Sequence, residues 1–307
     1  MEQFLRKLIL FIVLPTVYFA FNASVNYLIY SSQIVDVGKP NIIVIGDSHP
    51  MAAVNTNMLD NAINISRSAE PYVLTYWKLK AILKNHIPEI LIIGFSPHNI
   101  SAFNDKKFSD PDWSSEMFKR SYPIQQFDDI RNDIPIDEME YYKTLWKRTA
   151  FFPTTNHIYY LGTFNENRTT SNISNWQDRV QRHFYVDSTL ETPYEVSKIA
   201  VVYLDSIINL SQQYNIQTVL LGPPVHKYYY NEIPAHFLEA YEQIKNKYSQ
   251  DVLIFDMLTD STYVDEDFLD ANHLNIYGAN KLTTYLIHEI ERHNFQFTYP
   301  DIHFDPN

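Results

Sequence analysis

Residues 41–49 read Asn-Ile-Ile-Val-Ile-Gly-Asp-Ser-His and carry the signal for a buried parallel strand that ends in a sharp turn. Four consecutive β-branched residues are typical of a strand covered on both faces of a sheet. Gly46 lets the chain turn, and ligands of open α/β sheets bind at the carboxyl ends of the strands. Ser48 is therefore a candidate nucleophile beside the positive end of a helix, with a simple N-cap serine as the alternative.

Apolar runs and helical segments alternate on either side of this stretch. Predicted strands cover residues 41–45, 62–66, 90–93, 218–221 and 252–255. Predicted helices cover residues 71–85, 193–214, 232–248 and 277–292. Such alternation predicts a doubly wound α/β sheet.

A second polar stretch lies between the last predicted strand and the last predicted helix, where residues 270–275 read Asp-Ala-Asn-His-Leu-Asn. An Asp and a His three residues apart can pair, so that the carboxylate fixes the imidazole tautomer and leaves the other ring nitrogen to take a proton from a serine. Histidine suits this task because its ordinary pKa is near 6.5. Alone, the pattern is weak evidence, because an Asp and a His at this spacing usually form a surface pair.

Together, Gly-Asp-Ser after the first strand and Asp-x-x-His-x-Asn-x-x-Gly before the last helix resemble the SGNH (GDSL-like) hydrolase superfamily. The resemblance spans residues 41–99 and 193–295. It implies a flavodoxin-like three-layer α/β/α sandwich with a parallel five-stranded sheet. It also implies ester or acyl-transfer chemistry with Ser48, His273 and Asp270 as the catalytic triad, and no cofactor.

The remaining blocks of that family match less closely. Members commonly supply a glycine N–H and an asparagine side chain to the oxyanion hole, beside the N–H of the serine. Here Ala69 stands near the glycine position, and Ser96 stands near the asparagine position with Asn99 three residues later. We expect the oxyanion donors to come from Ser48 and Ala69, with either Asn99 or Ser96 in place of the usual asparagine. The alternative is a slow or specialised enzyme. Loss of one donor can lower the rate by about 10²–10³.

Four further side chains are predicted to line the pocket: Asp47, His49, His98 and His226. For His226 the alternative is a cap at the end of the fourth strand. Such groups can also assemble a metal site. No two of them have tight ligand spacing on one element, so we expect no metal. Asp47 is expected to bond nearby backbone amides and to shape the turn.

The amino-terminal 32 residues are predicted to form a transmembrane anchor. Residues 8–32 carry no charge and follow Arg6 and Lys7, and about 20 apolar residues suffice to cross a bilayer. Basic residues before the span predict a cytoplasmic amino terminus, which places the catalytic domain on the periplasmic or extracellular side of the cytoplasmic membrane. A cleaved signal peptide and a buried helix of the soluble domain are the alternatives.

Residues 100–192 interrupt the alternation and hold three of the four tryptophans, Trp113, Trp146 and Trp176. A long segment of this kind within a compact domain is usually a functional insertion, so a cap over the carboxyl edge of the sheet is expected. Its aromatic rings either stack on sugars or fill the cap's own core. Residues 33–40 are expected to be a linker and residues 296–307 a tail.

The chain has 24 basic and 36 acidic residues among 307, a net charge of −12, which argues against nucleic acid as a partner. The Phe-Ser-Pro-x-Asn pattern at 95–99, with a single anchor, loosely resembles membrane-tethered SGNH proteins such as alginate-type polysaccharide O-acetyltransferases and the D-alanyl transfer protein of teichoic acids. This implies acyl transfer to a cell-envelope glycan, with a multi-pass membrane acyltransferase as partner. A free-standing esterase and a non-catalytic, tethered glycan-binding or scaffold protein are the alternatives.

Overall fold

The computed structural model describes residues 1–32, 35–121, 131–151, 161–164 and 172–293. Its centre is a parallel sheet of five strands in the order β2-β1-β3-β4-β5. The strands are β1 (Ile42–Ile45), β2 (Ala62–Asn64), β3 (Ile90–Gly94), β4 (Gln217–Gly222) and β5 (Leu253–Asp256). This is the flavodoxin-like order, in which the direction of winding reverses between β1 and β3.

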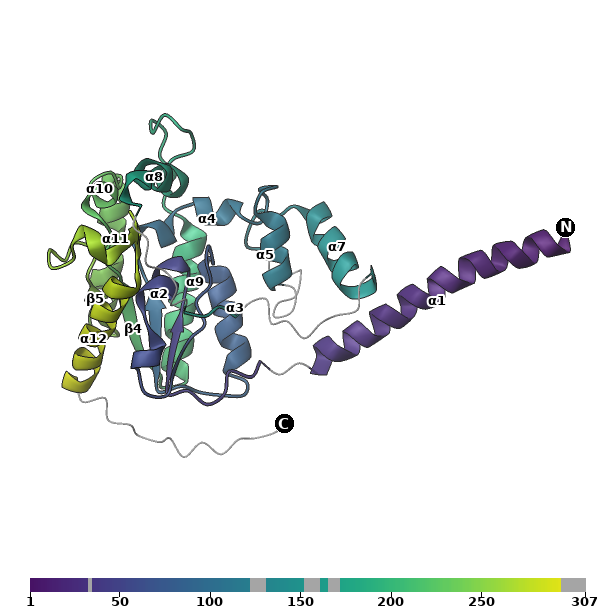
Figure 1. Cartoon of the computed structure of the whole chain (residues 1–307), viewed down its shortest axis with the longest axis horizontal. Coiled ribbons are helices and arrows are strands. Elements are labelled where there is room, and N and C mark those ends of the chain that lie inside the picture. The colour runs from purple at the N-terminus through teal and green to yellow at the C-terminus, as the bar shows by residue number, and fades with distance from the viewer. Residues whose placement is uncertain (33–34, 122–130, 152–160, 165–171, 294–307) are drawn as a thin grey trace.

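Helices cover both faces of the sheet (Figure 1). The sheet domain contains α2 (Ser48–Ala53), α3 (Tyr72–Ile82), α9 (Lys198–Gln213), α10 (Lys227–Tyr230), α11 (Ala235–Tyr248) and α12 (Ile276–Arg292). The insertion contains α4 (Phe103–Lys106), α5 (Ser114–Ser121), α7 (Glu138–Trp146) and α8 (Trp176–Phe184). A short antiparallel ribbon of β6 (Phe268–Asp270) and β7 (His273–Leu274) precedes α12.

Alternating side chains of each strand enter two separate cores. Ile43 and Ile45 of β1 pack with residues of α3, α9 and α11, whereas Ile42 and Val44 pack with residues of α2 and α12. All four side chains are at least 93% buried, since none exposes more than 7% of its surface. The predicted three-layer α/β/α sandwich with a five-stranded parallel sheet is confirmed.

The strands and helices predicted from the sequence are all present, with ends that differ by a few residues. The largest shift is at α9, which begins at Lys198 rather than at residue 193 because Ser197 caps it by accepting the N–H of Ala200. The proposed linker residues 33–34, parts of the insertion and the tail at 296–307 lie outside the described residues. The domain boundaries stay a prediction.

The amino-terminal helix α1 (Glu2–Ser32) extends away from the sheet domain (Figure 1). Its segment Glu2–Asn26 is long and apolar enough to cross a membrane, and only 6% of its most apolar window is buried. That exposure contradicts the alternative of a buried core helix. Phe19 stacks near Trp146 and Phe151, with ring centroids 5.1 and 5.9 Å away, so the insertion contacts this helix.

Candidate active site

The turn after β1 fixes the position of Ser48. Gly46 has a φ of +137°, and a Cβ there would lie 2.9 Å from the Pro50 ring and 3.2 Å from the backbone nitrogen of Gly94. Only glycine fits this conformation and this space. Asp47 then caps α2 by accepting the N–H of His49 at 2.9 Å, and Ser48 opens the helix. The sequence therefore places the hydroxyl at the carboxyl end of β1, where the winding of the sheet reverses.

The β6–β7 ribbon fixes the other half of the site. Asp270 pairs with His273 across the ribbon, and its Oδ1 accepts the backbone N–H groups of Asn272 and His273 at 3.0 and 2.9 Å. Asn275 caps α12 by accepting the N–H groups of Tyr277 and Gly278. The sequence predicted a loop here, and the ribbon explains why Asp and His three residues apart face each other.

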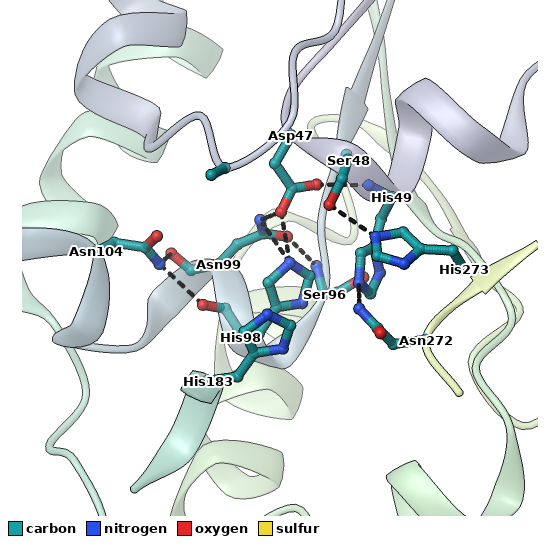
Figure 2. Close-up of polar contacts among 12 residues, drawn as sticks. Asp47, Ser48, His49, Ser96, His98, Asn99, Asn104, His183, Asn272 and His273 are labelled. Carbon is teal, nitrogen blue, oxygen red and sulfur yellow. Dashed lines mark hydrogen bonds and ion pairs between the residues drawn. The ribbon is translucent and has the colours of Figure 1, made fainter. Parts of the chain in front are cut away.

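The structure brings Ser48, His273 and Asp270 together, although 225 residues separate the serine from the histidine. Figure 2 shows the Ser48 side chain directed at the His273 ring, and Ser48 Oγ lies 2.8 Å from His273 Nε2. His273 Nδ1 lies 2.9 and 3.0 Å from the two Asp270 oxygens. Because Nδ1 faces a carboxylate, it carries the ring proton of the neutral imidazole, and Nε2 is left to accept the serine proton.

Asp270 stays ionised in this environment. Burial would raise the pKa of its carboxyl, but the hydrogen bond from His273 and the positive charge of Arg179 hold that pKa well below its usual range. Arg179 donates to Asp270 Oδ2 at 2.9 Å from α8, and Asn172 donates its N–H to Leu269 O at 2.8 Å. Residues of the insertion thus hold Asp270 and its strand in place. No local sequence pattern predicts these contacts.

Two backbone N–H groups are available as oxyanion donors. Ala69 has a φ of +61°, in the left-handed region that favours glycine. Ala69 and Ser48 both line the pocket. Within the described part of the chain, neither backbone N–H has a hydrogen-bond acceptor. The oxyanion role of both groups stays a prediction.

The structure does not bring Ser96 and Asn99 to the pocket wall. The Asn99 side chain accepts the N–H of Ser96 at 2.8 Å and donates to Asp47 Oδ2 at 2.9 Å (Figure 2). Both ends of the amide are used to hold the turn after β3 against the turn after β1. Asn99 is therefore a positioning residue, and the expectation that Asn99 or Ser96 supplies an oxyanion donor is corrected.

Of the four predicted pocket residues, Asp47 and His98 line the cavity. His98 Nε2 lies 2.5 Å from Asp47 Oδ2, and its ring stacks 4.8 Å from that of His183, which the sequence did not single out (Figure 2). His49 lies behind this wall, where its Nε2 contacts the side-chain amide of Asn272 at 2.9 Å.

His226 lies outside the cavity. Its imidazole caps α10 by accepting the N–H of Tyr228, and its other nitrogen lies 3.2 Å from Asp265. The prediction that it lines the pocket is corrected, because its hydrogen bonds direct the ring to the start of α10. No group of three metal-ligating side chains occurs among the described residues.

A larger hollow of about 570 Å³ lies beside α11 and β5, lined in part by Glu239, Glu242 and Asp256. It contains neither the serine nor any histidine. The candidate active site is therefore the smaller cavity, which is lined by Ser48 and His273.

The buried His49 predicts a pH-dependent stability. Burial and the nearby charge of His98 lower its pKa well below the usual value, so the folded state keeps the ring neutral while the unfolded chain binds a proton below about pH 6.5. Its contribution to stability is therefore full above about pH 6.5 and is lost as the pH falls. We expect His49→Gln to reduce the slope of unfolding free energy against pH by up to about 1.4 kcal/mol per unit between about pH 6 and pH 5. Urea unfolding at several pH values measures this, and an unchanged slope contradicts it.

A buried ion pair holds the loop that carries Ala69. Lys78 Nζ lies 2.7 Å from Glu70 and donates to Ile65 O at 2.8 Å, and both side chains are at most 2% exposed. Removal of one partner leaves the other charge buried without compensation, so Lys78→Met is expected to lower the unfolding free energy by about 3–5 kcal/mol. The double variant Glu70→Leu/Lys78→Met should recover most of this loss. Chemical denaturation tests both, and a single-variant loss below about 1 kcal/mol contradicts the assignment.

Fold and site together define a doubly wound α/β protein with a serine, a histidine and an aspartate in hydrogen-bonded series at the switch point of its sheet. Neither a protein-family model nor a curated protein matches the chain.

Solved structures similar to the chain include a Streptococcus pneumonia chain provisionally described as a platelet activating factor, at 14% identity over 92% of this chain and 98% of that one, with a TM-score of 0.43. A provisionally described acylhydrolase of Bacteroides fragilis is 11% identical over 87% and 96% of the two chains, with a TM-score of 0.42. A GDSL-like lipase of Bacteroides thetaiotaomicron is 8% identical over 88% and 98%, with a TM-score of 0.38.

Proposed function

We propose that the chain is a serine acyl-ester hydrolase or O-acyltransferase that acts through an acyl-serine intermediate. The observation that carries this proposal is the series Ser48 Oγ, His273 Nε2, His273 Nδ1 and Asp270, joined at 2.8 and 2.9 Å. A serine that only caps a helix does not require an oriented imidazole with a carboxylate behind it. Two N–H groups without acceptors beside the same hydroxyl, those of Ser48 and Ala69, add support.

The proposed reaction has two halves. His273 Nε2 takes the proton of Ser48 as Oγ attacks the acyl carbonyl carbon, and the N–H groups of Ser48 and Ala69 stabilise the resulting oxyanion. When the tetrahedral intermediate collapses, the alcohol or thiol of the donor leaves with the proton held on His273. A second hydroxyl, from water or a sugar, then gives its proton to His273 and attacks the acyl-serine. Collapse of that intermediate returns the proton to Ser48.

We further propose that α1 anchors this site to the outer side of the cytoplasmic membrane, so that the acceptor is a cell-envelope glycan and the acyl donor comes from a membrane partner. The length, apolar composition and exposure of the segment Glu2–Asn26 support an anchor. Trp113, from the insertion, lines the pocket and offers a ring on which a sugar can stack. Water and sugar hydroxyls need the same three residues, so the site accommodates both outcomes.

The alternative of a non-catalytic, tethered glycan-binding protein retains one supporting observation. The asparagine side chain expected in the oxyanion hole is engaged elsewhere, because Asn99 bonds Asp47 and Ser96. A binding protein of this kind has no use for the proton path between Ser48 and His273.

A partition experiment separates these possibilities. The full chain in detergent micelles is given p-nitrophenyl acetate, with and without a methyl glycoside as acceptor. We expect release of p-nitrophenol above the uncatalysed rate, with acetyl groups recovered on the glycoside if the chain is a transferase and as free acetate if it is a hydrolase. Release at the uncatalysed rate under both conditions would favour the binding protein.

A further inference from the structure

The insertion brings positive charge to the pocket of an otherwise acidic protein. Three cationic side chains line the cavity beside Ser48: Lys107, Arg179 and Arg182. The chain as a whole has a net charge of −12. A pocket lined by positive side chains has a positive electrostatic potential that attracts anions, even when the net charge of the protein is negative.

Lys107 is a buried cation without a carboxylate partner. Only 4% of its surface is exposed, and its Nζ donates to Ala69 O at 3.0 Å and to Asn104 Oδ1 at 2.7 Å. It also lies 4.8 Å from the ring centre of Phe103 and 5.5 Å from that of Trp113. Among the described residues no acidic group forms an ion pair with it. A buried charge is costly unless paired, so an anion bound beside Lys107 would stabilise its charged form.

The acids of the site are already engaged by other residues. Asp270 pairs with Arg179 and His273, and Asp47 accepts from His98, Asn99 and the N–H of His49. Neither carboxylate forms an ion pair with Lys107, although the more distant charge of Asp47 acts on it.

Arg182 extends the positive lining to the rim of the cavity. It is exposed and, in the part of the chain that the structure describes, forms neither an ion pair nor a hydrogen bond. Burial, with the positive charges of Arg120 and Arg182 adding to it, lowers the pKa of Lys107 to about 7, although Asp47 opposes this shift. An anion between the two side chains would favour the charged form of the lysine.

We propose that the pocket takes an ester whose acyl or alcohol part carries an anionic group, a carboxylate or a phosphate, held between Lys107 and Arg182 beside Ser48. The ester chemistry rests on the proposed function, whereas the anion site rests on the cations alone. Lys107 donates to the backbone oxygen of Ala69, and the backbone N–H of the same residue is the proposed oxyanion donor. The anionic group would therefore lie next to the substrate carbonyl that Ser48 attacks. A neutral substrate leaves Lys107 unpaired.

Matched acetyl esters test the proposal. One pair is an O-acetylated methyl galacturonoside as the free acid and as its methyl ester. The other is acetylated glycerol phosphate and acetylated glycerol. We expect the anionic member of one pair to have a kcat/KM about 10- to 100-fold above its neutral member, the effect of one charge-assisted hydrogen bond. The pair that shows the preference distinguishes a carboxylate from a phosphate.

Variants assign the preference to the two cations. Lys107→Met and Arg182→Gln should each reduce the ratio of anionic to neutral kcat/KM by about tenfold or more. Lys106→Met is the matched control, because Lys106 is the exposed neighbour of Lys107 and does not line the pocket. Arg182 is exposed, so its replacement does not threaten the fold. Equal rates for both members of both pairs, or a preference that survives both variants, would overturn the proposal.

Binding separates failure of the anion site from failure of the ester chemistry. Calorimetry with the Ser48→Ala chain should detect binding of galacturonate or glycerol phosphate, and much weaker binding of galactose and glycerol. If no ester is turned over but the anion binds in an Arg182-dependent manner, the proposed function fails and the anion site stands. If esters are turned over without preference and neither anion binds, the anion site fails and the proposed function stands.

Discussion

Replacement of Ser48 with alanine should lower the rate of ester turnover by at least about 10⁴-fold, since members of a Ser–His–Asp triad act as a unit and only the oxyanion donors and binding remain without the nucleophile. The hydroxyl is the one group within hydrogen-bond reach of His273 Nε2, at 2.8 Å, among the described residues. Initial rates of p-nitrophenol release from p-nitrophenyl acetate, corrected for the uncatalysed reaction, measure the loss.

Ser206→Ala is the matched control for this change. Ser206 is partly exposed on α9, where its hydroxyl donates to Val202 O, and it does not line the pocket. The control should retain the wild-type rate. A Ser48→Ala chain that keeps its rate within about threefold of the wild type would contradict the assignment of the nucleophile.

Asp270→Asn should lower kcat by about 10⁴-fold while leaving the chain folded. An amide NH₂ that faces His273 Nδ1 donates to that nitrogen, which moves the ring proton to Nε2 and leaves no acceptor for the proton of Ser48. The change also removes the charge that pairs with Arg179 and that would stabilise the imidazolium formed in the reaction. Steady-state kinetics of the folded variant, with circular dichroism as a check of the fold, measure the effect.

Asp265→Asn provides the comparison, because Asp265 is a carboxylate five residues away that pairs with His226 outside the cavity. We expect wild-type kcat for this variant. An Asp270→Asn chain with kcat within tenfold of the wild type would mean that the carboxylate does not orient His273.

The sheet could be predicted from the sequence because parallel strands buried on both faces need continuous apolar runs. The four side chains of residues 42–45 enter both cores, so all four are apolar. A half-exposed strand would alternate apolar and polar residues, and the continuous apolar run distinguishes this strand from it. Gly46 and Ser48 follow from the same stretch, since the turn requires glycine and the helix then opens on the serine. The approach of His273 to Ser48 could be predicted only because the order and spacing of the two motifs resemble those of a known hydrolase superfamily.

The rest of the site depends on contacts that sequence patterns do not encode. Arg179 and Lys107 come from the insertion, and their partners Asp270 and Ala69 lie 91 and 38 positions away. Asn99 was assigned to the oxyanion hole because of its place after a strand, but its amide is engaged by Asp47. Polar side chains in loops have several possible partners, and only the tertiary arrangement selects among them.

The central claim, that residue 48 is a nucleophile activated by residue 273, is tested most directly by covalent capture. The full chain is treated with a fluorophosphonate, and the modified peptide is located by mass spectrometry. We predict one adduct, on the Ser48 hydroxyl, which forms much more slowly in a His273→Gln chain. An unmodified protein, or an adduct on another residue while Ser48 remains free, would contradict the account.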